Sequence, residues 1–300
     1  MRRKIIKQGV GGSTIFLPAK WVRSNDLKPG DEVDVAEDGS KLIVSGHGTA
    51  EKRSIDIVVP TGRKQIIRSM ISNTYKKGYD VINVRCEQAD LKLIESAVQN
   101  LMGYEIIDVT AKGVTIKNVS EGLEAEYSNL FRKSFFLCKE NIRKMREDIN
   151  KGSYDRSAEV QEYRDLVTKY TDYCKRLLIK LKRNEDFAIF EYMVLWTVEK
   201  TSNELNYIYR YLAKARPKVN KVTFGNLDAA FTMFENLVTS YFKETTDYIQ
   251  KFTKEKDKFM YEDLPALSAR KDVDHYLLHC AANIVRRCHD MTGPFYGRFL

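Results

Sequence analysis

Basic side chains are concentrated at the start of this 300-residue chain. Six of them precede the first acidic residue, Asp26, and these are Arg2, Arg3, Lys4, Lys7, Lys20 and Arg23. Acidic residues then become frequent between positions 31 and 38. A segment with one basic and one acidic end attracts a phosphate backbone through its basic end. The six basic side chains are therefore candidate contacts to a phosphate backbone; the alternative is that they are solvated surface charges.

A second group that could do chemistry lies near the end of the chain. His275 and His279 are four residues apart, so they share one face if this stretch is helical. Two imidazoles at that spacing can chelate Zn²⁺ or Ni²⁺, and Asp272, Cys280 and His289 are near in sequence. One interpretation is a divalent metal site. The other is that both histidines are ordinary packed or solvated side chains of a bundle helix, and no cofactor is otherwise indicated.

Short strands and one short helix must position the basic residues. The apolar pair Ile5-Ile6 and the β-branched and aromatic run Thr14–Leu17 predict two strands. Pro18 suits the first position of a short helix, and alternation over 32–44 predicts a second hairpin. Residues 1–46 thus predict the order β-β-α-β-β. Because such a segment is too small to bury a core alone, we expect a second copy to complete it.

The run Gly12–Val22, followed by Leu27–Val33, resembles the SpoVT/AbrB family of DNA-binding domains. The leucine-proline element at 17–18 and the glycine-aspartate element at 30–31 lie at the family's spacing. The resemblance implies that residues 1–46 fold as a swapped-hairpin β-barrel and form a homodimer. It also implies that DNA is contacted by basic residues of the first strand, its loop and the short helix, which are the positions of the six basic residues named above.

Composition favours an intracellular protein with an anionic partner. Lys and Arg number 50 against 41 Asp and Glu, for a formal net charge of +9. The five cysteines are scattered and show no Cys-x-x-Cys, which predicts reduced thiols. The chain begins with charged residues and lacks the apolar stretch of a signal peptide, and its richest apolar run, 187–196, is too short to span a bilayer. We expect a soluble, cytoplasmic protein with no membrane insertion.

Residues 53–119 predict a small α/β domain. We expect strands over 54–59 and 81–84, a helix capped by Thr61 and ended by Gly78, a helix over 89–102, and a hairpin over 105–116. No glycine-rich phosphate loop or catalytic cluster occurs in this stretch. Its function is not indicated by the sequence.

From residue 121 the chain predicts long amphipathic helices. We expect them over 123–150, 158–182, 187–215, 223–254 and 272–291. Long helices joined by short connections form an antiparallel bundle. The stretch 255–270 is short and interrupted by Pro265, so the sequence allows either five or six helices in the bundle.

Residues 121–291 resemble the PhoU family of phosphate-signalling proteins. The resemblance rests on helix order, on the run 184–187 that opens the third helix, and on the closing stretch 281–285. It implies an all-α bundle of two three-helix repeats. In that family the third helix of each repeat carries a Glu/Asp-x-x-x-Asp motif that binds a metal cluster.

This chain departs from the family at that motif. At the motif positions of the first repeat the chain has Glu199 and Asn203, and at those of the second repeat it has His275 and His279. One acid of four remains, whereas a cluster of hard cations needs several carboxylate oxygens. Glu199 and the two histidines are therefore the candidate metal ligands, for a divalent metal at the bundle.

An AbrB-like front, an α/β middle and a PhoU-like bundle together resemble archaeal phosphate uptake regulators. The combination implies a DNA-binding transcriptional regulator of phosphate homeostasis whose bundle senses or docks an effector. The alternative is an adaptor that docks on a phosphate transporter or sensor kinase, with the basic segment serving mainly for dimerisation.

Two other classes fit less well. An antitoxin of the AbrB superfamily usually ends in a short disordered tail, whereas this chain continues into long predicted helices. An enzyme is not expected, because the chain has no G-x-S-x-G, P-loop, H-E-x-x-H or Rossmann fingerprint.

Overall fold

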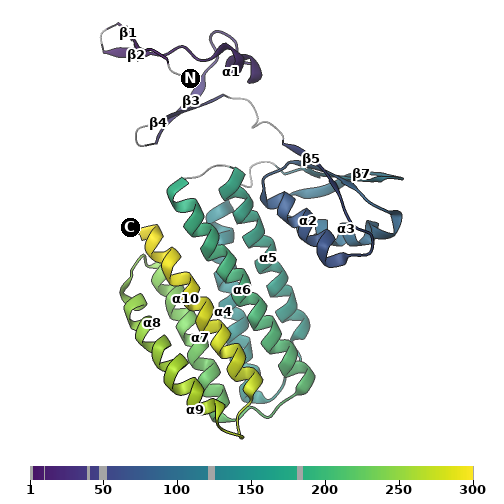
Figure 1. The fold of residues 1–300 in the computed structure, drawn as a ribbon, viewed down its shortest axis with the longest axis vertical. Coiled ribbons are helices and arrows are strands. Elements are labelled where there is room, and N and C mark those ends of the chain that lie inside the picture. Colours follow the sequence, from purple (N-terminus) through teal and green to yellow (C-terminus); the bar gives the residue numbers. More distant parts are fainter. Residues whose placement is uncertain are drawn as a thin grey trace. The chain divides into compact units, whose positions relative to one another are not determined.

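The computed structural model describes residues 3–9, 11–38, 41–46, 53–120, 126–180 and 185–299. The chain divides into two compact units, Met1–Arg53 and Ser54–Leu300 (Figure 1). A small β region thus precedes a large, mainly helical part, as the multidomain prediction requires. The further division at residues 53–119 and 121–291 stays a prediction.

The first unit contains two hairpins and a short helix. Its elements are β1 (Ile6–Gln8), β2 (Gly12–Thr14), α1 (Ala19–Ser24), β3 (Val33–Asp38) and β4 (Lys41–Gly46). The predicted order β-β-α-β-β is confirmed. Each hairpin is antiparallel and forms its own two-stranded sheet, so a single chain shows no closed barrel within the described residues.

The second strand is shorter and earlier than predicted. The sequence predicts it over Thr14–Leu17, but β2 ends at Thr14. The cause is the register, since β1 begins at Ile6 and Ile6 pairs with Thr14. Residues after Thr14 have no partner in β1, and the Phe16 side chain is 70% exposed.

The second unit begins with a four-stranded mixed sheet in the order β5-β6-β8-β7. The strands are β5 (Ser54–Val58), β6 (Val81–Arg85), β7 (Tyr104–Thr110) and β8 (Gly113–Asn118). Helices α2 (Lys64–Lys76) and α3 (Leu91–Val98) cover one face (Figure 1). Buried apolar residues of both layers, including Ile67, Ile71, Ile82, Ile94 and Ile116, form the core between them.

Thr61 does not cap the first of these helices. The N-cap is Arg63, which makes no side-chain capping bond. Gly62 takes a left-handed φ of 69°, and its amide donates to Asp90 Oδ1 at 2.8 Å. Because that turn cannot continue into helical geometry, the helix starts only after it. The second helix also ends earlier than predicted, at Val98.

The rest of the unit is a bundle of long helices. They are α4 (Tyr127–Lys151), α5 (Ser157–Lys180), α6 (Glu185–Ala215), α7 (Lys221–Phe242), α8 (Asp247–Lys258), α9 (Leu264–Ser268) and α10 (His275–Phe299). A π-helical turn, Phe259–Asp263, joins α8 to α9. When α8 and α9 are counted as one interrupted helix, the described part of the bundle has six helices, which settles the alternative left open by the sequence.

Two helix boundaries differ from the prediction. The helix expected over 223–254 is two helices, because the chain turns at Glu244, whose φ is 55°. Ser240 Oγ donates to the Thr245 carbonyl at 2.5 Å and stabilises this turn. The last helix begins at His275 rather than 272 and continues past residue 291 to Phe299.

The bundle consists of two groups of three helices. Helices α4, α5 and α6 pack against one another, as do α7, α8 and α10. The groups meet where α6 packs on α10 and α4 packs on α7. Aromatic residues fill the junction: the ring of Phe131 stacks on Tyr241, whose ring lies 4.5 Å from that of Phe295. These aromatic side chains therefore belong to the core of the bundle.

Within the described part of the chain, none of the helices is sufficiently long and apolar to span a membrane. The five cysteines are free thiols, as predicted.

Candidate nucleic-acid interface

The hairpin β1–β2 and helix α1 carry the basic residues predicted to bind DNA. Lys7 lies on β1, opposite Ser13 of β2. Arg3 and Lys4 precede the strand, and Lys20 and Arg23 lie on α1. All five side chains are exposed. Arg2 lies outside the described residues.

Local hydrogen bonds fix the short helix. Pro18 is its N-cap rather than its first helical residue. At the other end, Asn25 Nδ2 donates to the Trp21 carbonyl at 2.8 Å, and the Leu27 amide donates to the Val22 carbonyl at 3.1 Å. These bonds satisfy groups that a helix end leaves unpaired.

Lys20 and Arg23 lie on one side of α1. They are three residues apart in a helix, a spacing that places side chains next to each other. Arg23 Nε donates to the Ala19 carbonyl at 3.3 Å, which leaves the two terminal nitrogens of the guanidinium for other partners. One short helix can therefore present two cations to one anionic surface.

In the described part of this unit, the acidic residues form no ion pair with the five basic side chains named above. Asp31 instead closes the turn before β3, where its Oδ2 accepts from the Lys28 amide at 2.7 Å. Gly30 provides the left-handed φ of 100° that this turn needs. Among the residues that the structure describes, none of the five basic side chains forms an ion pair with an acid.

The described part of the first unit has no core of its own. Among its residues with described side chains, every one is exposed or only partly buried. The exposed apolar side chains are Ile5, Ile6, Ile15, Phe16, Val35 and Leu42. Exposed apolar side chains in this number, in a segment of this size, favour an association surface.

Residues 13–54 match the family model described as "Antidote-toxin recognition MazE, bacterial antitoxin". This part of the N-terminal region is therefore similar to MazE-type domains. The match begins in β2, so it includes Lys20 and Arg23 but leaves Lys7 outside, and it does not extend to the sheet core or the bundle. Comparisons with curated proteins and with solved structures found no match.

The candidate metal ligands are not brought together. His275 and His279 are exposed at the start of α10, and His279 Nε2 lies 3.2 Å from Asn283 Nδ2. Asn283 in turn faces Glu204 of α6 at 3.4 Å. Since α6 and α10 run in opposite directions, Glu199 lies beyond Glu204, further from the histidines. Within the described ranges, no three His, Cys, Asp or Glu side chains are arranged to hold a metal ion.

The neighbours that the sequence suggests as further ligands are also separate. Asp272 precedes α10 and pairs with Arg270 at 2.6 Å. Cys280 is buried, whereas His275 and His279 are exposed, and burial raises the pKa of its thiol to about 12. His289 is exposed more than two turns further along the helix.

Glu199 already has a cationic partner. Its Oε2 lies 2.5 Å from Nζ of Lys175, a fully buried lysine of α5. The same ammonium lies 3.7 Å from Asp172 Oδ1. Burial alone would raise the pKa of the Glu199 carboxyl, but Lys175, with Lys200 and Lys76, holds it below its ordinary value. A lysine thus supplies the positive charge that a metal would otherwise supply at this carboxylate.

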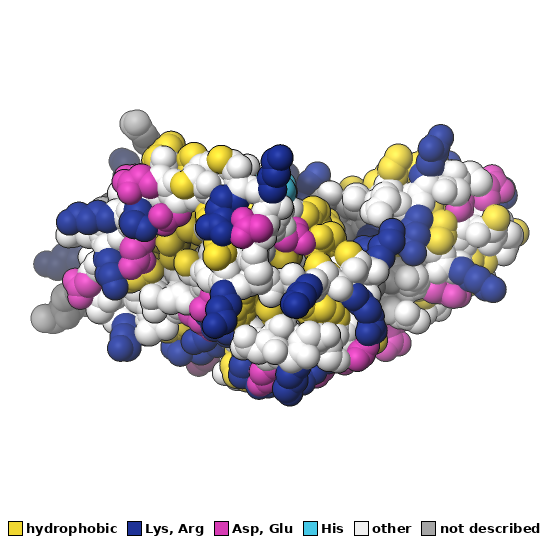
Figure 2. All heavy atoms as spheres, turned by 90° about the horizontal axis from the view of Figure 1, so that it is seen from below, with side chains coloured by type: hydrophobic (Ala, Val, Ile, Leu, Met, Phe, Trp, Pro, Cys, Tyr) yellow, Lys and Arg dark blue, Asp and Glu magenta, His cyan; other side chains and the backbone are white. Residues whose placement is uncertain are grey.

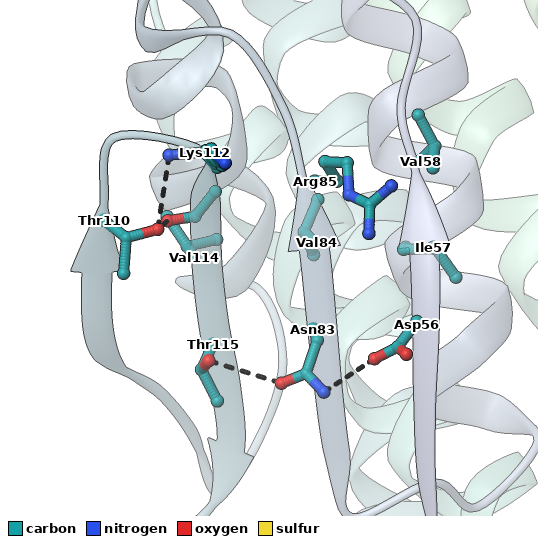
Figure 3. A pocket seen from close by; sticks show the side chains of 11 residues that line it. Asp56, Ile57, Val58, Asn83, Val84, Arg85, Thr110, Lys112, Val114 and Thr115 are labelled. Carbon is teal, nitrogen blue, oxygen red and sulfur yellow. Dashed lines mark hydrogen bonds between the residues drawn. The ribbon is translucent and has the colours of Figure 1, made fainter.

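A shallow pocket lies on the uncovered face of the sheet (Figure 3). Asn83 is at its centre, where Nδ2 donates to Asp56 at 2.7 Å and Oδ1 accepts from Thr115 at 3.3 Å. These side chains satisfy one another across three strands. We therefore assign no ligand to this pocket.

Sequence reasoning missed a polar pocket between the sheet helices and the bundle. Arg68, Ser72 and Lys76 repeat every four residues along α2, so they form one polar stripe. This four-residue spacing of polar side chains was the signal in the sequence that could have indicated the pocket. Its partners, on α5 and α6, are about a hundred residues away in sequence and were not recognisable from it.

Proposed function

We propose that this protein is a DNA-binding transcriptional regulator whose MazE/AbrB-like domain pairs with a second copy. The carrying observation is that one small unit combines five exposed cations with six exposed apolar side chains, and that the cations are unpaired within the described residues. The second copy would bury Phe16 and its neighbours and close the two hairpins into the swapped barrel. The basic ends of both copies would then face the same duplex.

The energetics of such an interface come mainly from phosphate contacts. Each Lys or Arg that neutralises a phosphate releases counterions, and affinity then falls steeply with salt. Contacts of this kind set the position on the duplex but do not read its sequence. The proposal therefore predicts strong salt dependence and leaves the operator to other contacts.

We assign the bundle a sensory or docking role in phosphate homeostasis, without catalysis. The two three-helix groups support this, because their third helices, α6 and α10, are adjacent as two repeats would place them. A phosphate transporter or signalling protein is the partner that this role requires. An effector can act only if it has different affinities for two conformations of the protein.

An antitoxin-type regulator is the second candidate. The name of the matched family model favours it, since that model describes an antidote that recognises a toxin. In that case the second unit, Ser54–Leu300, would carry the partner-binding surface. Co-purification of a toxin-sized protein whose growth inhibition this chain relieves would favour this candidate over the first.

Fluorescence anisotropy of the full chain on random and promoter-derived duplexes, across a salt series, tests the DNA proposal. We expect binding that weakens with salt. The slope of log K against log salt should become shallower by about 0.9 for each phosphate that a variant no longer neutralises. The double variant Arg3→Ala, Lys7→Ala removes two such cations from each copy.

The matched control is Lys92→Ala, Lys112→Ala, which removes the same charge from exposed positions on α3 and the β7–β8 turn. It should leave the slope close to that of the wild type. No binding at low salt would reject the DNA proposal and favour the adaptor. The next experiment would then be a pull-down with transporter and kinase candidates.

A further inference from the structure

We propose that the pocket between α2, α3, α5 and α6 binds a small phosphate-bearing anion. The pocket has a volume of about 290 Å³ and is lined by side chains from both the sheet helices and the bundle. Figure 2 shows a notch between the lobe with α2 and α3 and the helices of the bundle, and the lining residues come from these elements. This inference names a ligand for the sensory role above and rests on that role only for the effect on DNA.

The acids of the pocket are already matched by cations. Glu199 pairs with Lys175 at 2.5 Å, and Asp172 lies 3.4 Å from Lys76 Nζ. Asp172 Oδ2 also accepts from Ser72 Oγ at 2.8 Å. The charges of two carboxylates and two ammonium groups therefore balance. These four groups form part of the pocket wall and do not attract further cations.

Positive charge remains after this pairing. Arg68 of α2 and Lys200 of α6 both line the pocket, and neither has an ion-pair partner among the residues that the structure describes. The Lys200 ammonium lies over the face of Trp196, with Nζ 5.5 Å from the ring centroid. An excess of two cations in a half-buried polar site favours an anion that carries about two charges.

Hydrogen-bond donors are available in the same place. Arg164 of α5 uses Nε on Asn203 and one terminal nitrogen on Asp165, both at 2.7 Å, which leaves its other terminal nitrogen for a ligand. Arg68 has its whole guanidinium available, a planar fork that matches two phosphate oxygens. Lys76 makes no hydrogen bond within the described residues, although it is close to Asp172.

The size of the pocket limits the ligand. Sites for drug-sized molecules usually occupy about 300–1,000 Å³, so this pocket is at the lower end. Inorganic phosphate, or the phosphate group of a small metabolite, fits both the size and the charge. Because the cations come from α2, α5 and α6, the bound anion would link the sheet part to the bundle.

Thermal unfolding and calorimetric titration of the full chain test this inference at constant ionic strength. The probes are inorganic phosphate, AMP and adenosine, the last as the analogue without phosphate. We expect phosphate or AMP to bind and to raise the midpoint, and adenosine to do neither. Binding of AMP alone would assign the site to a phosphorylated metabolite.

The decisive variant is Arg68→Ala, which should weaken binding at least about tenfold. The control is Arg210→Ala, which removes an exposed arginine of α6 outside the pocket and should bind like the wild type. Arg68→Lys should retain part of the affinity. If Arg68→Ala unfolds without ligand, Lys200→Met tests the same charge from the other side of the pocket.

The inference is overturned if neither phosphate nor AMP binds, if adenosine binds as tightly as AMP, or if Arg68→Ala binds like the wild type. Anisotropy on DNA with and without phosphate then separates the two proposals. Anion binding without DNA binding rejects the regulator and keeps the site. DNA binding without anion binding keeps the regulator and rejects the anion site.

Discussion

Arg176 of α5 donates from one terminal nitrogen to Asp80 Oδ1 at 2.7 Å, across the junction between the bundle and the sheet part. The two side chains are only 3% and 5% exposed. The other terminal nitrogen donates to the carbonyls of Tyr75 and Tyr79, where α2 ends. A cation at a helix C-terminus is favoured by the helix dipole, so a single guanidinium holds the end of α2 against α5.

Removing that guanidinium should destabilise the second unit strongly. Arg176→Ala takes the buried cation from Asp80, which keeps the more exposed ammonium of Lys180. It also removes one of the donors to each of the Tyr75 and Tyr79 carbonyls. We expect a decrease of about 3–5 kcal/mol in the free energy of unfolding, measured by urea denaturation. Arg210→Ala, an exposed arginine on α6, should change it by less than about 0.5 kcal/mol. Equal effects of the two changes would contradict this account.

The Glu199–Lys175 pair makes stability depend on pH in a defined direction. The folded-state pKa of Glu199 lies below its ordinary value of 4.5. The pair therefore stabilises the fold above pH 4.5, and this stabilisation is lost as the pH falls through the folded-state pKa. We expect Glu199→Gln to cost about 3 kcal/mol at pH 7, and this cost to shrink as the pH falls through the folded-state pKa of Glu199.

The measurement is urea denaturation of both proteins between pH 7 and pH 3. Glu162→Gln is the matched control, since it makes the same change at an exposed carboxylate of α5. A wild-type advantage over Glu199→Gln that stays constant across this range would refute the ion-pair explanation.

Phe16→Asp should prevent the association of the MazE/AbrB-like domains. Phe16 is 70% exposed in a single chain, and a charge placed at a surface that becomes apolar on pairing is not compensated. We expect the wild type to be a dimer by light scattering, and the variant a monomer with little DNA affinity. Tyr261→Asp places the same charge at an exposed aromatic residue of the second unit and should remain a dimer.

The histidine pair on α10 gives a direct metal test. If His275 and His279 chelate Zn²⁺, titration should show one weak site that His279→Ala removes. His289→Ala, an exposed histidine on the same helix, should keep it. Unchanged Zn²⁺ binding in His279→Ala would exclude the pair as ligands.

Local patterns were sufficient for most of the elements. Gly78 and Gly152 both follow helices and adopt left-handed conformations, and glycine at such positions is a signal that sequence shows. The α/β order and the β-β-α-β-β order came from short alternating and apolar runs in the same way. These features depend on neighbours within a few residues, so the sequence could indicate them.

Features that depend on distant partners were not predictable. The turn at Glu244 contains neither glycine nor proline, and its left-handed backbone is unfavourable for glutamate. Lys175 is an interruption in an apolar stripe when the sequence is viewed alone, and only the packing of α6 brings Glu199 beside it. The cations of the pocket were not predictable for the same reason, since Arg68 and Lys200 line one pocket only because α2 packs against the bundle.

The lack of a core in the first unit has a consequence for gene dosage. A unit that gains its buried surface only from a second chain has a stability that rises with protein concentration. The second unit buries a core within one chain. At low copy number the second unit would be folded while the first was still unassembled, so any activity that needs the first unit would begin only above a threshold amount of protein. Thermal unfolding should then show two melting transitions, of which only one shifts to lower temperature on dilution.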